Sequence, residues 1–416
     1  MASDIVVALK DASASGATLF ALNHHAEPNV RHRLVCALGQ HHDAGDLVRT
    51  STVAVPQVRQ TAAILGTQPF NQWGLLYGVN EHRVALGVTE WASRLPGGAR
   101  GLNGCDLVRL ALERCHGAYH AIEILTDLLE HHAPEAGNDL IFLVADPREA
   151  FVLEASGRFW ALLECGHSRV VTDTAMIRQD WRRLAPGLAQ HVIEHGWWQD
   201  DGSKIDFVGC LSQANERSRN AQKRWGRASL ALTQQQGAID AHFLRRMMAD
   251  HYAMNRELYS DPRSTTLACS FMTELPAANQ PFVCWVSFGP PKVALHFPVS
   301  LAGEVPLAFC ESLPEAASIE EQMRELLKLA TGKEADRARL VQMLERLQTR
   351  FDQDAEELLA RCHESAHGRG SEVGALATEM MHAHAELFAK ENRRLFGVDQ
   401  PGAAKTEVEE EVLFFA

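Results

Sequence analysis

The chain has 416 residues, of which 46% are hydrophobic and 22% are charged, close to the average of a soluble globular protein. This composition excludes a disordered or collagen-like chain. The 40 basic and 53 acidic residues give a formal net charge of −13, which argues against a protein that binds nucleic acid or anionic membranes.

The nine cysteines form no CxxC pair, a pattern typical of reduced thiols in a cytoplasmic protein. Segment 1–16 has no basic region followed by a long apolar run, so no signal peptide is expected. No apolar run is long enough for a transmembrane helix. The 20 histidines include no HExxH motif, and we expect neither a metal nor an organic cofactor. The predicted location is cytoplasmic.

The first hundred residues predict β-strands. Apolar runs at 5–9 and 17–22 flank the turn signal at 15–16 and predict an N-terminal hairpin. A further strand is expected at 84–88, after the polar turn at 80–83.

The hydrophobic period then changes. Between 103 and 132 apolar residues recur three and four positions apart, which predicts two helices or one helix broken at Gly117. Apolar runs at 140–145, 150–155 and 159–163 predict a β-meander, and strands return between 266 and 297.

From about Pro314 the sequence predicts an amphipathic helical region of some 80 residues. Three apolar stripes define its helices: Ile319, Met323, Leu326, Leu327 and Ala330; Leu340, Leu344, Leu347, Phe351, Leu358 and Leu359; and Val373, Leu376, Met380, Leu387 and Phe388. We expect these helices to pack on their own domain, although they could also bind a protein partner or a second copy. The predicted division is 1–310 for the main domain, 311–398 for the helical extension and 399–416 for a flexible acidic tail.

Several segments together resemble one known family. They are SDIVVAL at 3–9, GAT at 16–18, LNHHAEP at 22–28, WGLLYGVNEH at 73–82, DLVRLALER at 106–114 and DPREAFVLEA at 146–155. The order and spacing of these segments resemble the secernins and related bacterial dipeptidases, a branch of the N-terminal-nucleophile amidohydrolases. The resemblance implies an α+β fold, a four-layer αββα sandwich with a C-terminal helical extension.

The resemblance also implies site residues. The family's nucleophile is a cysteine at the start of the first strand, with its own α-amino group as the base, and Ser3 occupies that position here. The family's oxyanion-binding asparagine corresponds to Asn80. Two supporting positions, an aspartate and an asparagine in the family, correspond to His25 and Asp173. The same motifs imply that Asn23, Trp73 and Glu81 contact the substrate, expected to be a small peptide or an N-acyl amide.

Three hypotheses follow. In the first, the chain is a dipeptidase-like amide hydrolase in which Ser3 attacks the carbonyl and Asn80 stabilises the oxyanion; removal of Met1 and Ala2 would be needed to free the Ser3 amine. In the second, the fold is retained without catalysis, as a binding protein. In the third, the substituted positions Ser3, His25 and Asp173 form a triad amidase or acyltransferase, which needs no free amine.

Overall fold

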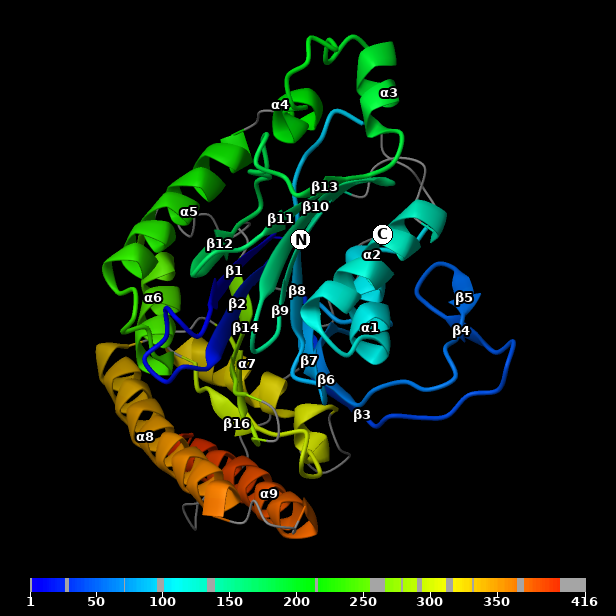
Figure 1. The fold of residues 1–416 in the computed structure, drawn as a ribbon. Coiled ribbons are helices and arrows are strands. Elements are labelled where there is room, and N and C mark those ends of the chain that lie inside the picture. Colours follow the sequence, from blue (N-terminus) through cyan, green and yellow to red (C-terminus); the bar gives the residue numbers. More distant parts are fainter. Residues whose placement is uncertain are drawn as a thin grey trace, which may run out of the picture.

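The structure is a computed structural model, and it describes two large antiparallel sheets with helices on both outer faces (Figure 1). The described residues are 2–26, 30–70, 72–95, 101–132, 139–213, 216–254, 266–277, 280–289, 294–311, 317–330, 333–364 and 370–396. The region 399–416, expected to be a flexible acidic tail, lies outside them.

The first sheet, called here the β1 sheet, has the strand order β12-β1-β2-β14-β15-β16 within the described residues. Its strands are β1 (Ala2–Ala8), β2 (Thr18–Ala26), β12 (Ser168–Val171), β14 (Thr266–Leu275), β15 (Cys284–Phe288) and β16 (Phe297–Val299). Neighbouring strands pair antiparallel throughout. The N-terminal hairpin is therefore confirmed as β1 and β2 at the centre of this sheet.

The second sheet, called the β8 sheet, has the order β13-β11-β10-β9-β8-β7-β6-β3 in the described part of the chain. Its strands are β3 (His32–Ala37), β6 (Ile64–Pro69), β7 (Tyr77–Asn80), β8 (Ala85–Glu90), β9 (Asp139–Ala145), β10 (Ala150–Ser156), β11 (Phe159–Glu164) and β13 (Arg183–Leu184). A small ribbon of β4 (Leu47–Arg49) and β5 (Ala54–Pro56) projects beside it. The predicted meander is confirmed as β9, β10 and β11.

Helices cover the two outer faces. The helices α1 (Gly104–Arg114) and α2 (Ala118–His132) lie against the β8 sheet, and α5 (Glu216–Gln234) and α6 (Ala241–Met254) lie against the β1 sheet (Figure 1). Two short helices, α3 (Leu188–Glu194) and α4 (Phe207–Leu211), precede α5. The result is an α+β fold in four layers, αββα, as predicted.

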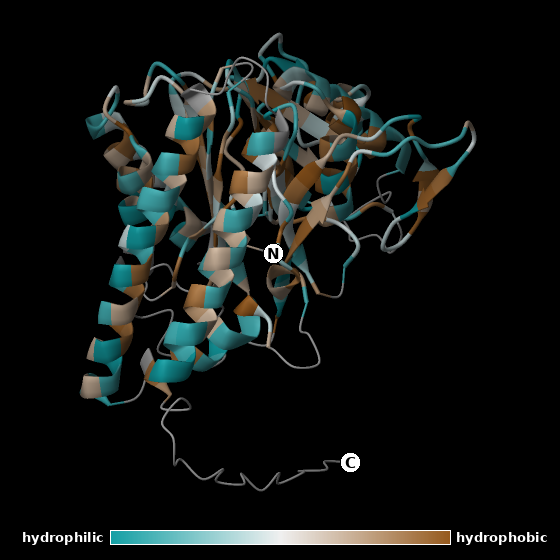
Figure 2. Ribbon diagram, turned by 90° about the horizontal axis from the view of Figure 1, so that it is seen from below, coloured by the Kyte–Doolittle hydropathy of each residue, from teal (hydrophilic) through white to brown (hydrophobic). Residues whose placement is uncertain are grey.

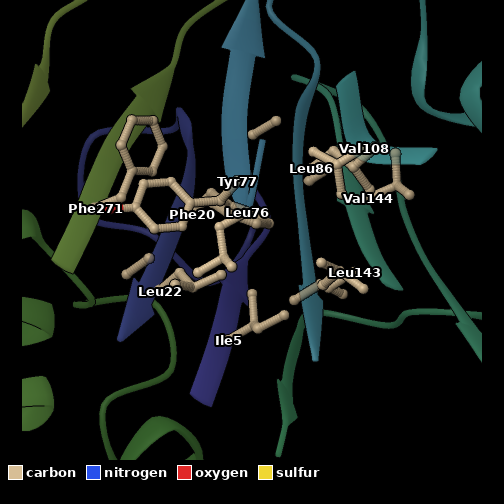
Figure 3. Close-up of a cluster of buried hydrophobic side chains, with 14 of the residues drawn as sticks. Ile5, Phe20, Leu22, Leu76, Tyr77, Leu86, Val108, Leu143, Val144 and Phe271 are labelled. Carbon is tan, nitrogen blue, oxygen red and sulfur yellow. The ribbon is translucent and has the colours of Figure 1, made fainter. Parts of the chain in front are cut away.

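The space between the sheets is filled by apolar side chains that alternate along each strand. Ile5, Phe20 and Leu22 of the β1 sheet point toward the β8 sheet, where Tyr77 and Leu143 meet them (Figure 3). The sheets approach so closely that a Cβ atom at Gly87 would lie 2.6 Å from Leu22 Cδ1. Since strand residues alternate between faces, odd-numbered positions of β1 and even-numbered positions of β2 face this core.

The two predicted helices at 103–132 are confirmed as α1 and α2. Asn103 is the N-cap of α1, and its side chain accepts a hydrogen bond of 2.9 Å from the Asp106 N–H, satisfying a donor that the first helical turn leaves free. The sequence did not predict α5 and α6. Most residues of α5 are polar or charged, so few apolar residues mark its buried face in the sequence.

The three predicted C-terminal helices are confirmed as α7 (Ile319–Ala330), α8 (Glu334–Glu364) and α9 (Gly370–Leu395). They pack against β15 and β16 and against one another, with Phe297 of β16 in edge contact with Phe388 of α9. Their surfaces alternate between hydrophilic and hydrophobic residues, whereas the strands behind them are mainly hydrophobic (Figure 2). Among the described residues, no helix has the length and apolarity needed to cross a bilayer.

We expect Leu22→Ala to destabilise the protein by about 2–5 kcal/mol, because it opens a cavity between two sheets that cannot easily collapse. Leu22 is fully buried, whereas Leu47 on β4 is 64% exposed, so Leu47→Ala is the matched control and should change stability little. Urea unfolding of the three proteins measures the difference. Equal midpoints for Leu22→Ala and Leu47→Ala would contradict the packing described here.

Candidate active site

Ser3 and His24 lie side by side in the space between the two sheets. They are directly paired across β1 and β2, so both side chains point to the same face. The Ser3 Oγ atom lies 3.1 Å from His24 Nδ1, and the Ser3 backbone N–H donates a 2.9 Å hydrogen bond to Thr89 Oγ1 of β8. Ser3 is 0% exposed and His24 is 3% exposed. The arrangement is a serine–histidine pair enclosed by both sheets.

Burial keeps His24 neutral. Desolvation lowers the pKa of His24 well below its ordinary value, and the neighbouring His32 and His25 rings lower it further. His32 lies with its ring centroid 5.3 Å from that of His24, and burial, followed by the nearby Arg324, lowers the pKa of His32 to about 4. A neutral His24 can accept the Ser3 hydroxyl proton at Nδ1 when its own proton is on Nε2. The pair therefore has the geometry of a nucleophile and a general base.

A second, ionic cluster lies on the opposite face of the same strands, under α5. Asp4 Oδ2 lies 3.1 Å from His25 Nε2, and Asp4 accepts hydrogen bonds of 3.0 and 3.2 Å from Arg224 Nε of α5. The Arg224 guanidinium also donates to Asp173. Burial alone would lower the pKa of Arg224, but the Asp4 and Asp173 carboxylates outweigh it and raise that pKa.

The Ser3–His25–Asp173 triad is therefore not assembled. Adjacent residues of a strand point to opposite faces, so His25 faces α5 while Ser3 faces the β8 sheet. His25 contacts Asp4, and Asp173 contacts Arg224. The histidine that the fold brings to Ser3 is His24.

Asn80 is not beside Ser3 either. Its Nδ2 donates to the carbonyl oxygens of Leu112 (2.9 Å) and Cys115 (2.8 Å) at the end of α1, and its Oδ1 accepts from two N–H groups of the turn that follows β7. Asn80 thus points to the helical side of the β8 sheet and satisfies carbonyls that a helix end leaves free. In this arrangement the Asn80 amide donates to α1 carbonyls and does not face Ser3, as the expected oxyanion role would require.

The three residues expected to contact substrate lie apart from one another. Asn23 donates to the Met248 carbonyl of α6 at 3.0 Å. The Arg109 Cζ atom lies over the Trp73 ring, 4.2 Å from the ring centroid. Glu81 accepts a 2.7 Å hydrogen bond from the Ala63 N–H. Each makes contacts that stabilise the fold, and the structure does not bring them to Ser3.

The site residues that the sequence did not identify are His24, Thr89 and Arg224. The adjacent histidines at 24 and 25 were visible, but choosing between them requires the register of the hairpin. Arg224 had no recognisable motif. In the described part of the chain, no three His, Cys, Asp or Glu side chains converge in a way that could hold a metal ion.

No protein-family model matches the chain. Among solved structures it is similar to penicillin V acylase from Agrobacterium tumefaciens, with 11% identity over 71% of this chain and 86% of that one and a TM-score of 0.43. A variant of conjugated bile acid hydrolase from Clostridium perfringens has 11% identity, covers 71% and 92%, and has a TM-score of 0.45. A Caenorhabditis elegans orthologue of N-acylethanolamine-hydrolyzing acid amidase has 11% identity, covers 65% and 91%, and has a TM-score of 0.35. The four-layer assignment rests on the strand pairings and helix contacts of this chain itself.

We expect Arg224→Met to destabilise the protein by about 3–5 kcal/mol, because it removes a buried cation that bonds to both Asp4 and Asp173. Arg178→Met is the control, since the Arg178–Asp206 ion pair is largely exposed and its loss should change stability by less than about 1 kcal/mol. Chemical denaturation measures both. A similar loss in the two variants would show that the cluster is not essential to the fold.

The buried histidines should make the protein sensitive to acid. The pKa of His32 is about 4 in the folded state and about 6.5 in the unfolded state, so between these values the unfolded chain binds more protons and stability falls as the pH falls, by about 3 kcal/mol for His32. Glu154 acts in the opposite direction, since burial raises its pKa to about 7. Glu154 is present in both the wild type and a His32→Gln variant. Its contribution therefore cancels when the unfolding free energy of the variant is subtracted from that of the wild type at each pH.

The measurement is the urea midpoint at pH 7, 5.5 and 4.5. The wild type should lose more stability than His32→Gln across this range, whereas the exposed control His41→Gln should follow the wild type. Parallel curves for wild type and His32→Gln would contradict the buried, neutral state of His32.

Proposed function

We propose that the chain hydrolyses linear amide bonds, with Ser3 as the nucleophile and His24 as the general base. The observation that carries the proposal is the 3.1 Å contact between Ser3 Oγ and His24 Nδ1, with the imidazole neutral in a buried site. A serine hydroxyl is a weak nucleophile until a neighbouring base accepts its proton. The resemblance to the secernin and dipeptidase branch favours small peptides or N-acyl amides as substrates.

The chemistry follows from the two atoms in contact. As Ser3 Oγ bonds to the amide carbonyl carbon, its proton passes to His24 Nδ1. The tetrahedral intermediate breaks its C–N bond, and the His24 proton passes to the leaving amine. A water molecule then attacks the acyl-serine carbonyl carbon while His24 accepts its proton. The C–O bond to Ser3 breaks, the His24 proton passes to Ser3 Oγ, and the acid product leaves. Because His24 supplies the base, this route needs no free Ser3 amine and operates with Met1 and Ala2 in place.

A non-catalytic binding protein is the second candidate, and a specific observation favours it. Ser3 has no exposed surface, and the Asn80 amide is committed to α1. In that case the serine–histidine contact would only satisfy two buried polar groups.

The experiment compares His24 with its neighbour. We expect Ser3→Ala to abolish hydrolysis of a dipeptide and N-acyl amide library, and His24→Gln to lower kcat/KM about 10²–10⁴-fold, the usual contribution of a general base. His25→Gln, normalised to the folded fraction, is the matched control and should retain activity within a few-fold. Because the pKa of His24 is lowered, the rate should stay constant as the pH falls through 6.5.

The outcomes separate the hypotheses. A larger loss in His25→Gln than in His24→Gln would overturn the proposed base. If the intact mass lacks Met1 and Ala2 and His24→Gln remains active, the Ser3 amine is the base instead. No turnover and no labelling of Ser3 by a fluorophosphonate, in a folded chain, would leave the binding protein as the function.

A further inference from the structure

A cavity lies between the C-terminal half of α5 and the first half of α6. It has a volume of about 710 Å³ and is lined by Arg227, Ala228, Leu230, Ala231 and Gln234 of α5, by Gln235 just after it, and by Phe243, Arg246 and Met247 of α6. This volume is within the range of ligand sites. We call it the α5–α6 groove. Its lining on α5 begins at Arg227, one turn beyond Arg224, and includes no described residue of the ionic cluster or of the serine–histidine pair.

The groove combines apolar surface with positive charge. Arg227, Leu230 and Gln234 follow one another at helical spacing along α5, and Leu230 is 58% exposed although it is a large hydrophobic residue. Arg227 and Arg246 are also exposed. Among the described lining residues of the groove, the only charged ones are these two arginines, in a chain whose formal net charge is −13. The groove therefore fits a partner that is acidic and apolar together.

One segment of the same chain has this composition. Residues 407–415 read EVEEEVLFF, with four glutamates and five apolar residues. They lie beyond Phe396, the last described residue. The glutamates complement Arg227 and Arg246, and the apolar residues complement the exposed Leu230 and the ring of Phe243.

The described contacts put the start of this segment within reach of the groove. Glu391 near the end of α9 lies 3.6 Å from Arg346 of α8, and Asp352 of α8 lies 2.7 Å from Arg245 of α6. Arg346 and Asp352 are six positions apart, about 9 Å along a helix. The end of α9 is thus close to α6, and the eleven residues from 396 to 407 can span up to about 36 Å.

We propose that residues 407–415 bind the α5–α6 groove of their own chain. The glutamates lie against Arg227 and Arg246, and the aromatic residues cover Leu230 and Phe243. Binding removes an exposed apolar surface from water, and the linking residues raise the effective concentration of the segment at the groove.

The test is photo-crosslinking in the full-length chain. A p-benzoylphenylalanine in place of Phe414 should crosslink to residues 227–247 in a product of monomer mass, as mapped by mass spectrometry of tryptic peptides. Arg227→Glu combined with Arg246→Glu should lower the crosslinking yield about tenfold, equivalent to the loss of a few modest contacts. Reversing Glu409, Glu410 and Glu411 to lysine in that double variant should restore most of the yield.

A matched pair controls for surface changes in general. Leu230→Glu should lower the yield, whereas Leu47→Glu, at a similarly exposed leucine on the far side of the molecule (Figure 1), should not. The crosslinking yield of the chain without groove substitutions is also measured at high salt. Screening should lower this yield, and the measurement does not depend on the folding of any groove variant.

Crosslinks that map elsewhere, or a yield that ignores both salt and charge reversal, would overturn the proposal. Adducts of dimer mass would also overturn it, and would identify a second copy as the occupant.

Discussion

The register of the β1–β2 hairpin determines which histidine lies beside Ser3. Ser3 is paired with His24, and because side chains alternate along a strand, a slip of one residue would replace His24 with His25 beside the serine. Both faces of the hairpin are buried, so the register is fixed from two sides. Ile5 and Leu22 pack into the intersheet core, while Asp4 is held by Arg224.

This alternation also separates neutral from charged groups. The inner face holds a serine and a histidine whose imidazole burial keeps neutral, and the outer face holds the ions Asp4, Arg224 and Asp173. A carboxylate beside His24 would favour the protonated imidazole and remove the base at neutral pH. The low pKa that keeps His24 unprotonated also makes it a weaker base, since proton-transfer efficiency follows basicity. Under the proposed mechanism, the low pKa of His24 widens the pH range of activity and lowers the driving force for proton transfer.

The elements that could be predicted from the sequence are those formed by residues close together in the chain. The hairpin, α1, α2, the meander and the C-terminal helices depend on local apolar periodicity, and that periodicity was sufficient to place them. The helix α5 was not predicted because its buried arginine, Arg224, bonds to partners more than 50 residues away in sequence, Asp4 and Asp173. Nothing in a local pattern distinguishes such an arginine from a solvated one.

The roles assigned to His25 and Asn80 do not match the structure for a related reason. Motif correspondence assigned these roles by position in the sequence. The face that His25 occupies is set by strand pairing across a nine-residue loop, and the direction of Asn80 is set by its contact with α1. The turn at 9–17 is too long to fix the register by itself, since only two- or three-residue turns do so. The identity of the residue beside Ser3 is therefore a tertiary property.

The same argument connects α5 with the strand that carries Ser3. Arg224 bonds to Asp4 and Asp173, and Arg227, one turn further along the helix, lines the groove. Asp4 is the residue that follows Ser3 on β1. Displacing α5 at Arg224 would break a buried ion cluster, which costs several kcal/mol. The cluster therefore opposes a shift of the strand register that brings His24 to Ser3.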